Sequence, residues 1–157
     1  MVKTIALLTA EDVYRLGSDC RGELIDGVLI EMPPVNVPHG RVTMRLGSRV
    51  LAHADANDLG HVYTEVGFIL RRNPDRLRAP DIAFVRKDRI PPEGKPSQGF
   101  WEFVPDLVVE VISPGDAPGE VQLKIREWIE AGVRLLWAVY PDTWTITVMR
   151  SLLDRRN

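Results

Sequence analysis

The stretch PDLVVEVISP, residues 105–114, predicts a strand at the centre of a covered sheet. Five of the six residues from 107 to 112 are aliphatic, which is typical of strands that are buried on both faces. Glu110 is the exception. Because burying an unpaired polar group costs roughly 2–7 kcal/mol, this carboxylate needs a cation, a proton or a metal ion beside it. Glu110 is therefore the first candidate functional residue.

Length and composition favour one globular domain over residues 1–157, with a frayed tail expected over residues 151–157. The chain is 45% hydrophobic, yet no apolar run reaches the roughly 18–20 residues of a membrane-spanning helix. The single cysteine, Cys20, excludes an internal disulfide, and the first residues lack the order of a secretory signal. We expect a soluble, cytoplasmic protein.

Charge is unevenly distributed along the chain. The formal net charge of −2 argues against a protein coated with basic groups for non-specific nucleic-acid binding. Residues 71–89 nevertheless hold seven basic and three acidic residues, a net charge of +4. One of the three acidic residues, Asp81, lies inside this basic segment.

The hydrophobic pattern predicts an α/β fold, a mixed β-sheet flanked by helices. Thr9 can cap a short helix over residues 9–16, and the Asp26-Gly27 turn predicts a hairpin over residues 23–32. Longer helices are expected over residues 39–55 and 119–131. The remaining strands are expected over 61–70, 81–85, 107–112, 135–139 and 144–149, with a proline-rich surface loop over 88–100.

Two carboxylates and a lysine form the candidate catalytic set. Asp81 opens a predicted strand, Glu110 lies in another, and Lys124 lies in the helix that follows. Magnesium takes oxygen ligands, often one or two carboxylates with water and phosphate oxygens in the other positions. A lysine ammonium near such an ion can orient the attacking water or stabilise charge on the phosphorus centre.

These residues resemble a known signature. Pro80-Asp81, followed by an apolar strand that bears Glu110, is similar to the Pro-Asp…(Asp/Glu)-x-Lys motif of the restriction-endonuclease-like nuclease superfamily. More specifically, the sequence resembles the Uma-two family, which is described as a family of restriction endonucleases. The resemblance runs from about residue 9 to residue 149, and its motifs are ELIDG at 23–27, His39, PD at 80–81, PDLVVEVISP at 105–114, Lys124 and GVRLLW at 132–137.

The resemblance implies a restriction-endonuclease-like fold and hydrolysis of DNA with Mg²⁺ or Mn²⁺. The superfamily lysine is expected two residues after the second acid, where this chain has Ile112, and Lys124 from the next helix is the position that fits. The resemblance also implies that Glu23 lies near the metal. It further leads us to expect more C-terminal strand and loop sequence than this chain contains.

Our leading hypothesis is a magnesium-dependent endonuclease that uses Asp81, Glu110 and Lys124 on DNA. The basic segment would contact the phosphate backbone, which predicts salt-sensitive binding. The expected nucleic-acid contacts are His39, Arg71, Arg72 and Arg78. Because cutting both strands of a duplex is easiest with two sites, we also expect a homodimer.

Other functions remain open from the sequence. One alternative is a catalytically silent nucleic-acid-binding or regulatory module of the same fold. A second is a glycoside hydrolase with Asp81 and Glu110 as an acid and base pair, which would need no metal. The sequence does not decide between DNA and RNA or reveal a sequence specificity.

Structural roles compete with the functional ones. Glu110 could pair with Arg78 or Arg134 as a buried ion pair, and His39 could cap the long helix. Glu23 could be a hairpin charge. One cysteine and scattered histidines disfavour a zinc site. The tryptophans, at 101, 128, 137 and 144, are expected to pack in the core.

Overall fold

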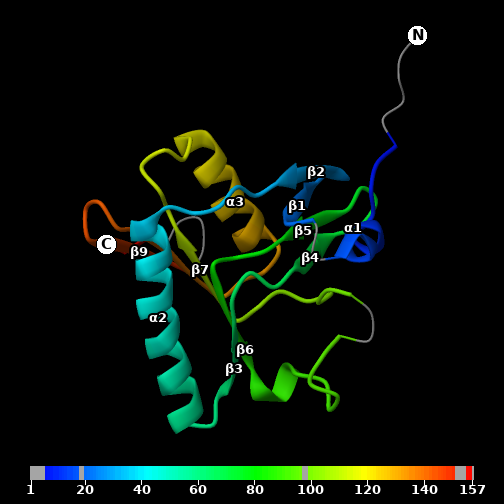
Figure 1. The fold of residues 1–157 in the computed structure, drawn as a ribbon. Helices are drawn as coiled ribbons and strands as arrows, with labels where there is room; N and C mark the ends of the chain where they lie inside the picture. The colour runs from blue at the N-terminus through cyan, green and yellow to red at the C-terminus, as the bar shows by residue number, and fades with distance from the viewer. Residues whose placement is uncertain (1–5, 18–19, 97–98, 151–154, 157) are drawn as a thin grey trace.

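A six-stranded sheet forms the larger layer of the computed structural model, which describes residues 6–17, 20–96, 99–150 and 155–156 (Figure 1). Its strand order is β10-β9-β8-β7-β6-β3. The strands are β3 (Gly60–Tyr63), β6 (Ile82–Arg86), β7 (Leu107–Val111), β8 (Leu135–Tyr140), β9 (Thr145–Met149) and β10 (Arg155–Arg156). Only β7 and β8 pair in parallel among these described strands, because α3 (Pro118–Glu130) connects them as a crossover helix. All five residues of β7 are buried, as the sequence predicts.

A smaller sheet of order β2-β1-β5-β4 packs beside the first. Its strands are β1 (Gly22–Ile25), β2 (Val28–Glu31), β4 (Phe68–Arg71) and β5 (Arg76–Arg78). The hairpin of β1 and β2 turns at Asp26 and Gly27, whose φ angles are 54° and 77°. Two successive positive φ angles are what a tight hairpin turn requires, so the predicted Asp-Gly turn is confirmed.

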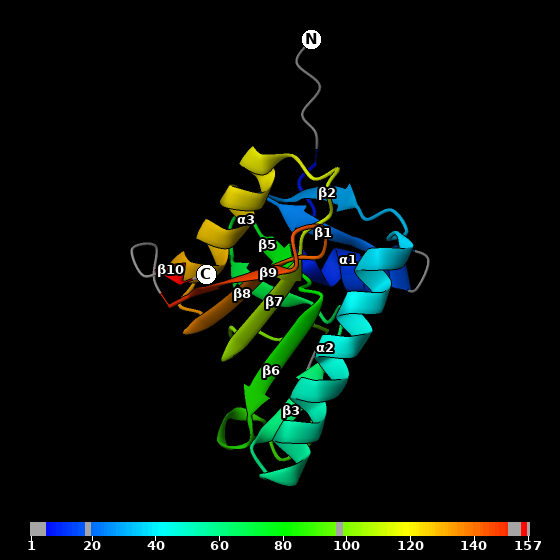
Figure 2. The same cartoon turned by 90° about the vertical axis from the view of Figure 1, so that its left-hand side faces the viewer.

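The two faces of the six-stranded sheet have different covers (Figure 2). Helix α2 (Val37–Ala56) packs on one face, where Val42, Leu46 and Val50 meet Val109 and Val111 of the central strand. The other face packs against α3 and against Phe68 of β4. Because side chains alternate along a strand, Val108 and Glu110 point to the face that α3 covers. The central strand therefore delivers its one carboxylate to α3.

Helix ends follow local sequence signals. Helix α1 (Ala10–Leu16) starts with a capping box between Thr9 and Asp12 and ends at Gly17, as predicted. Helix α2 is capped by Asn36, whose side chain accepts a hydrogen bond from the His39 N–H at 2.9 Å. His39 thus lies in the first helical turn, and Asn36 is the cap instead.

The expected strand over residues 61–70 is wrong in its extent. The chain leaves β3 after Tyr63, passes through Glu65 at φ 56°, and enters β4 in the other sheet. Gly67 makes this crossing possible, because a Cβ there would lie 2.5 Å from the Phe100 ring. Strand β5, which lies within the basic segment, is not among the predicted strands.

The C-terminal residues are described only in part. Of the tail expected to fray, Arg155 and Arg156 pair with β9, and 151–154 and 157 lie outside the described residues. Within the described chain, no helix combines the length and apolar character that crossing a membrane needs.

Candidate active site

Glu110 meets two side chains of α3. Its Oε1 accepts a hydrogen bond from Trp128 Nε1 at 2.8 Å, and its Oε2 lies 3.0 Å from Lys124 Nζ. Lys124 and Trp128 are four residues apart and therefore share one face of the helix. Glu110 is only 4% exposed, so the expectation of a partner for this buried carboxylate is confirmed. Lys124, and neither Arg78 nor Arg134, supplies the cation.

Lys124 also contacts Glu23 from the smaller sheet. Its Nζ lies 3.2 Å from Glu23 Oε1, which also accepts a hydrogen bond from the Ala79 N–H at 2.9 Å. The second oxygen, Oε2, accepts from Arg78 at 2.6 Å. Both oxygens of Glu23 therefore have protein donors. Glu23 contacts Lys124 from strand β1, and its expected contact with a metal stays a prediction.

Asp81 lies directly before β6 and is bonded to the strand that carries Glu110. Its Oδ2 accepts a hydrogen bond from the Val111 N–H at 2.7 Å, and its Oδ1 lies 3.2 Å from His39 Nε2. Because Val111 follows Glu110 in β7, the two predicted carboxylates lie at the same end of neighbouring strands. The fold therefore brings together Asp81, Glu110 and Lys124, which are far apart in the sequence.

Arg78 is buried and pairs with acidic residues of neighbouring elements. Its side chain is only 7% exposed, and it donates to Glu23 and to Glu127 of α3, the latter at 2.5 to 2.7 Å. Arg76 donates to the other oxygen of Glu127 at 2.8 Å. The prediction that Arg78 contacts nucleic acid does not fit this burial. Arg78 instead joins β1, β5 and α3 beneath the candidate site.

Arg71 and Arg72 lie at the turn between β4 and β5, at the other end of β5 from Asp81. Arg71 is paired with Asp26. Arg72 is paired with three acidic side chains, namely Glu11, Asp75 and Glu102. Both arginines are partly exposed, so their expected contact with nucleic acid stays a prediction, but their charge is largely balanced within the protein.

Burial and neighbouring charges shape the proton affinities of the site. Burial, together with the charges of Asp81 and Glu23, raises the pKa of Glu110 to about 7 against the lowering effect of Lys124. Contact with Asp81 raises the pKa of His39. Burial works against the ammonium of Lys124, but Glu110 and Glu23 on either side outweigh it and raise the pKa. The site thus holds a permanent cation among several mutually repelling carboxylates.

Comparison with known proteins identifies the family. The model of the Uma2 family, described as "Putative restriction endonuclease", matches residues 10–156. The chain belongs to the Uma2 family. No curated protein matches significantly. A crystal structure described as that of "a putative nuclease belonging to DUF820" from Anabaena variabilis has a TM-score of 0.79 and 21% identity, over 95% of this chain and 83% of the other. This likeness and the mixed sheet confirm the restriction-endonuclease-like fold.

The donor set of this Uma2 chain fits a magnesium ion. Among the described residues, no group of three or more histidine, cysteine, aspartate or glutamate side chains converges to hold a metal. Magnesium does not require such a group, because it is commonly held by one or two carboxylates and keeps several waters. Asp81 and Glu110 supply two carboxylates. Burial is the main cause of the raised pKa of Glu110 and the charge of Asp81 adds to it, and a bound cation would offset both effects.

Two residues of the site do not follow from the sequence patterns of this Uma2 chain. Trp128 is predicted only as a core residue, and no pattern marks Glu127. Both lie on the face of α3 that carries Lys124, since they follow it by four and three residues. That spacing is a signal in the sequence. An acidic residue on the apolar face of a helix requires a buried partner, which here is Arg78.

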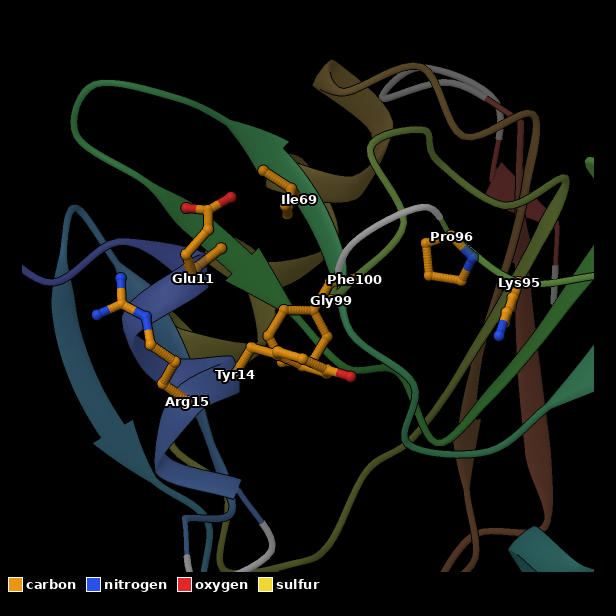
Figure 3. Close-up of a pocket in the computed structure, with 9 residues that line it drawn as sticks. Glu11, Tyr14, Arg15, Ile69, Lys95, Pro96, Gly99 and Phe100 are labelled. Atoms are coloured by element: carbon orange, nitrogen blue, oxygen red, sulfur yellow. The ribbon is translucent and has the colours of Figure 1, made fainter.

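A cavity of about 610 Å³ is lined by a different set of residues (Figure 3). It opens between α1, which contributes Glu11, Tyr14 and Arg15, and the segment that contains Lys95 and Phe100. The rings of Tyr14 and Phe100 meet edge to face at 5.8 Å. Within the described chain, none of the residues bonded to Glu110 or Asp81 lines this cavity, so its size alone does not link it to the site.

Proposed function

We propose that the chain is a magnesium-dependent endonuclease that hydrolyses phosphodiester bonds of DNA. One observation carries the proposal: Asp81 is bonded to the Val111 N–H next to Glu110, and Glu110 is bonded to Lys124. Two carboxylates and one ammonium at a strand end are the groups that this reaction needs. Membership of the Uma2 family supports the same reaction class.

Asp81 and Glu110 would hold the ion. Bound there, magnesium would lower the pKa of a water and offset negative charge on the phosphate. Lys124 is placed to donate a hydrogen bond to the attacking water or to a phosphate oxygen as charge develops. Glu23 and Glu110 keep this ammonium charged and oriented, because each lies within 3.2 Å of it. His39 orients Asp81 through their contact.

Contacts with the phosphate backbone of DNA require exposed cations near this end of the sheet. Helix α2 begins at the site and presents Arg41, Arg45 and Arg49 to solvent, four residues apart. In the described chain, no carboxylate forms an ion pair with these three arginines. They are better placed than the buried Arg78 to meet phosphates, and they supplement the predicted contacts of Arg71 and Arg72.

Plasmid cleavage tests the proposal. Purified protein should nick supercoiled DNA with Mg²⁺ or Mn²⁺ and stop when chelator is added. Asp81→Asn and Glu110→Gln should abolish cleavage and metal binding together. Lys124→Met should lower the rate by about 10²- to 10³-fold, the usual effect of removing one donor to a transition state, while metal binding persists.

Two results would contradict the proposal. Cleavage that persists in chelator, or in Glu110→Gln, would remove the metal centre from the mechanism. DNA binding that survives Glu110→Gln, without cleavage by the wild-type protein with any divalent metal on supercoiled, linear or single-stranded DNA, would favour the catalytically silent module. Calorimetric titration with Mg²⁺ would support that conclusion if no binding is seen.

A further inference from the structure

Trp144 differs from the expectation that the tryptophans pack in the core. It lies in the turn between β8 and β9 and is 86% exposed, whereas Trp101 and Trp128 are buried. Its φ angle is 56°, a conformation that bulky side chains rarely adopt. Backbone conformations of this kind cluster at active sites and ligand-binding sites, where the surrounding structure maintains them. The exposed indole therefore points to a ligand.

Trp144 lines a cavity of about 440 Å³ that adjoins the candidate active site. This volume lies within the usual range of small-ligand pockets, about 300–1,000 Å³. His39 lines the same cavity, and its Nε2 is the atom that lies 3.2 Å from Asp81 Oδ1. Ser113, another lining residue, follows Val111 by two positions. The cavity and the carboxylate pair are therefore joined through His39 and the end of β7.

The lining of the cavity favours a flat, uncharged ligand. Three proline rings, those of Pro38, Pro114 and Pro141, stand with the indole as apolar walls. The polar lining includes Asp142 and Asn36, whose amide accepts a hydrogen bond from the His39 N–H and donates one to Ser113 Oγ. Among the described residues, no lysine or arginine lines the cavity. Asp142 would repel a phosphate, and among the described lining residues only His39 can carry a positive charge, but its Nε2 already faces Asp81. A nucleobase, by contrast, offers a π face and hydrogen-bonding edges.

We propose that this cavity, the Trp144 cavity, binds an unstacked nucleobase of the strand whose phosphodiester lies at Asp81 and Glu110. The inference rests on the proposed function and specifies its substrate: a nucleic acid with an unpaired or extruded nucleotide beside the cleaved bond. A base inside an intact duplex cannot present its face to an indole. Trp144 supplies the stacking surface, and the carboxylate centre takes the adjoining phosphate.

The test compares two oligonucleotides of equal charge. One is a twelve-nucleotide thymidine strand, and the other is a twelve-residue abasic strand with the same phosphates and no bases. Binding of each, labelled with a fluorophore, is measured by anisotropy in Ca²⁺, and quenching of tryptophan emission reports stacking. The wild-type protein should bind the thymidine strand about tenfold or more tightly than the abasic strand, as expected for one stacked base. Its tryptophan emission should fall only with the thymidine strand.

Variants then assign the preference to one side chain. Trp144→Ala should bind both strands equally, and Trp144→Phe should retain most of the preference because it keeps an aromatic face. Tyr14→Ala is the matched control, since Tyr14 is also exposed but lines the other cavity. It should behave like the wild-type protein. Thermal unfolding should show that all three variants remain folded, because both side chains are largely exposed.

Each contrary result overturns the inference. Equal binding of the two strands by the wild-type protein, or no binding of either, excludes a base site. A preference that survives Trp144→Ala places the base elsewhere. If Trp144→Ala changes only the oligomeric state in light scattering, the indole contacts another copy of the chain. Metal-dependent plasmid cleavage that is retained in any of these cases would leave the proposed function standing without this site.

Discussion

The carboxyl group of Glu110 lies where ionisation is unfavourable, and that makes metal binding depend on pH. Burial and the charges of Asp81 and Glu23 outweigh Lys124 and raise the pKa of Glu110 to about 7. Below that pH the carboxyl keeps its proton, which a metal ion must displace. We therefore expect the affinity for Mg²⁺ to fall by about tenfold for each pH unit below 7 and to level off above 7.

Calorimetric titration of the wild-type protein with Mg²⁺ at pH 5.5, 6.5, 7.5 and 8.5 checks this prediction. Glu110→Gln serves as the control, because it removes the titrating group and should bind weakly at every pH. An affinity that does not change between pH 5.5 and 8.5 would show that Glu110 is already ionised in the free protein, or that it does not bind the metal.

Arg78 stabilises the fold beneath the site. It lies between the buried carboxylates of Glu23 and Glu127, and contact with both raises the pKa of its guanidinium despite the cost of burial. Breaking such a pair leaves uncompensated charge in the interior and typically costs 3–5 kcal/mol. Arg78→Met should therefore lower the free energy of unfolding by about 3 kcal/mol or more in urea denaturation.

The matched control is Arg15→Met in helix α1. Arg15 pairs with Asp12, but its side chain is 73% exposed, and exposed pairs contribute only about 0–1 kcal/mol. The two variants remove the same charge and volume. Equal decreases in the free energy of unfolding would mean that the buried ion pairs of Arg78 contribute no more to stability than the exposed pair of Arg15. That result would contradict the role inferred for Arg78.

Helix α2 connects the site with a cationic surface. Its buried face packs on the six-stranded sheet, its first turn holds His39 against Asp81, and its outer face carries Arg41, Arg45 and Arg49. If these arginines meet phosphates, the double variant Arg41→Gln/Arg45→Gln should weaken DNA binding without regard to sequence. The slope of log affinity against log salt should become less steep by about 0.9 for each phosphate that the variant no longer neutralises.

Arg126→Gln in α3 is the control for that experiment. Arg126 is an exposed helical arginine on the element that carries Lys124, and among the described residues it has no ion pair. Binding measured by anisotropy from 50 to 300 mM salt should be nearly unchanged in this variant. If Arg126→Gln weakens binding as much per removed charge as the double variant does, the attraction is a general electrostatic one and α2 has no special role.

Elements with strong local signals could be predicted from the sequence, and those fixed by distant contacts could not. The capping box at Thr9, the Asp26-Gly27 turn and the aliphatic run of β7 each specify their structure within a few residues. Strand β5 has only three residues, two of them arginines, and exists because it pairs between β1 and β4. The break after Tyr63 likewise depends on packing of Gly67 against Phe100.

The same division holds for the candidate site. Asp81, Glu110 and Lys124 could be chosen because a buried carboxylate demands a partner and a motif supplies candidates. The role of Arg78 could not be predicted, because seven basic residues in one segment indicate an exposed cationic surface until their ion-pair partners are known. Six of them pair with carboxylates from other parts of the chain, namely Arg71, Arg72, Arg76, Arg78, Lys87 and Arg89, and Arg86 pairs with Asp88 inside the segment. Linear charge therefore overstated the basic surface.

The proposed activity has a consequence for the number of chains that act on a duplex. One carboxylate pair with one lysine can cut one strand at a time, whereas cutting both strands at the same place needs two sites facing opposite strands. We therefore expect a homodimer on duplex DNA. Light scattering with uncleaved DNA in Ca²⁺ should give two chains per duplex, and linear plasmid should form with a higher order in protein concentration than nicked plasmid does. If the chain remains monomeric at every concentration and yields only nicked circles, it cuts one strand of the duplex at a time. That result would agree with an unpaired base in the Trp144 cavity and would remove the dimer from the mechanism.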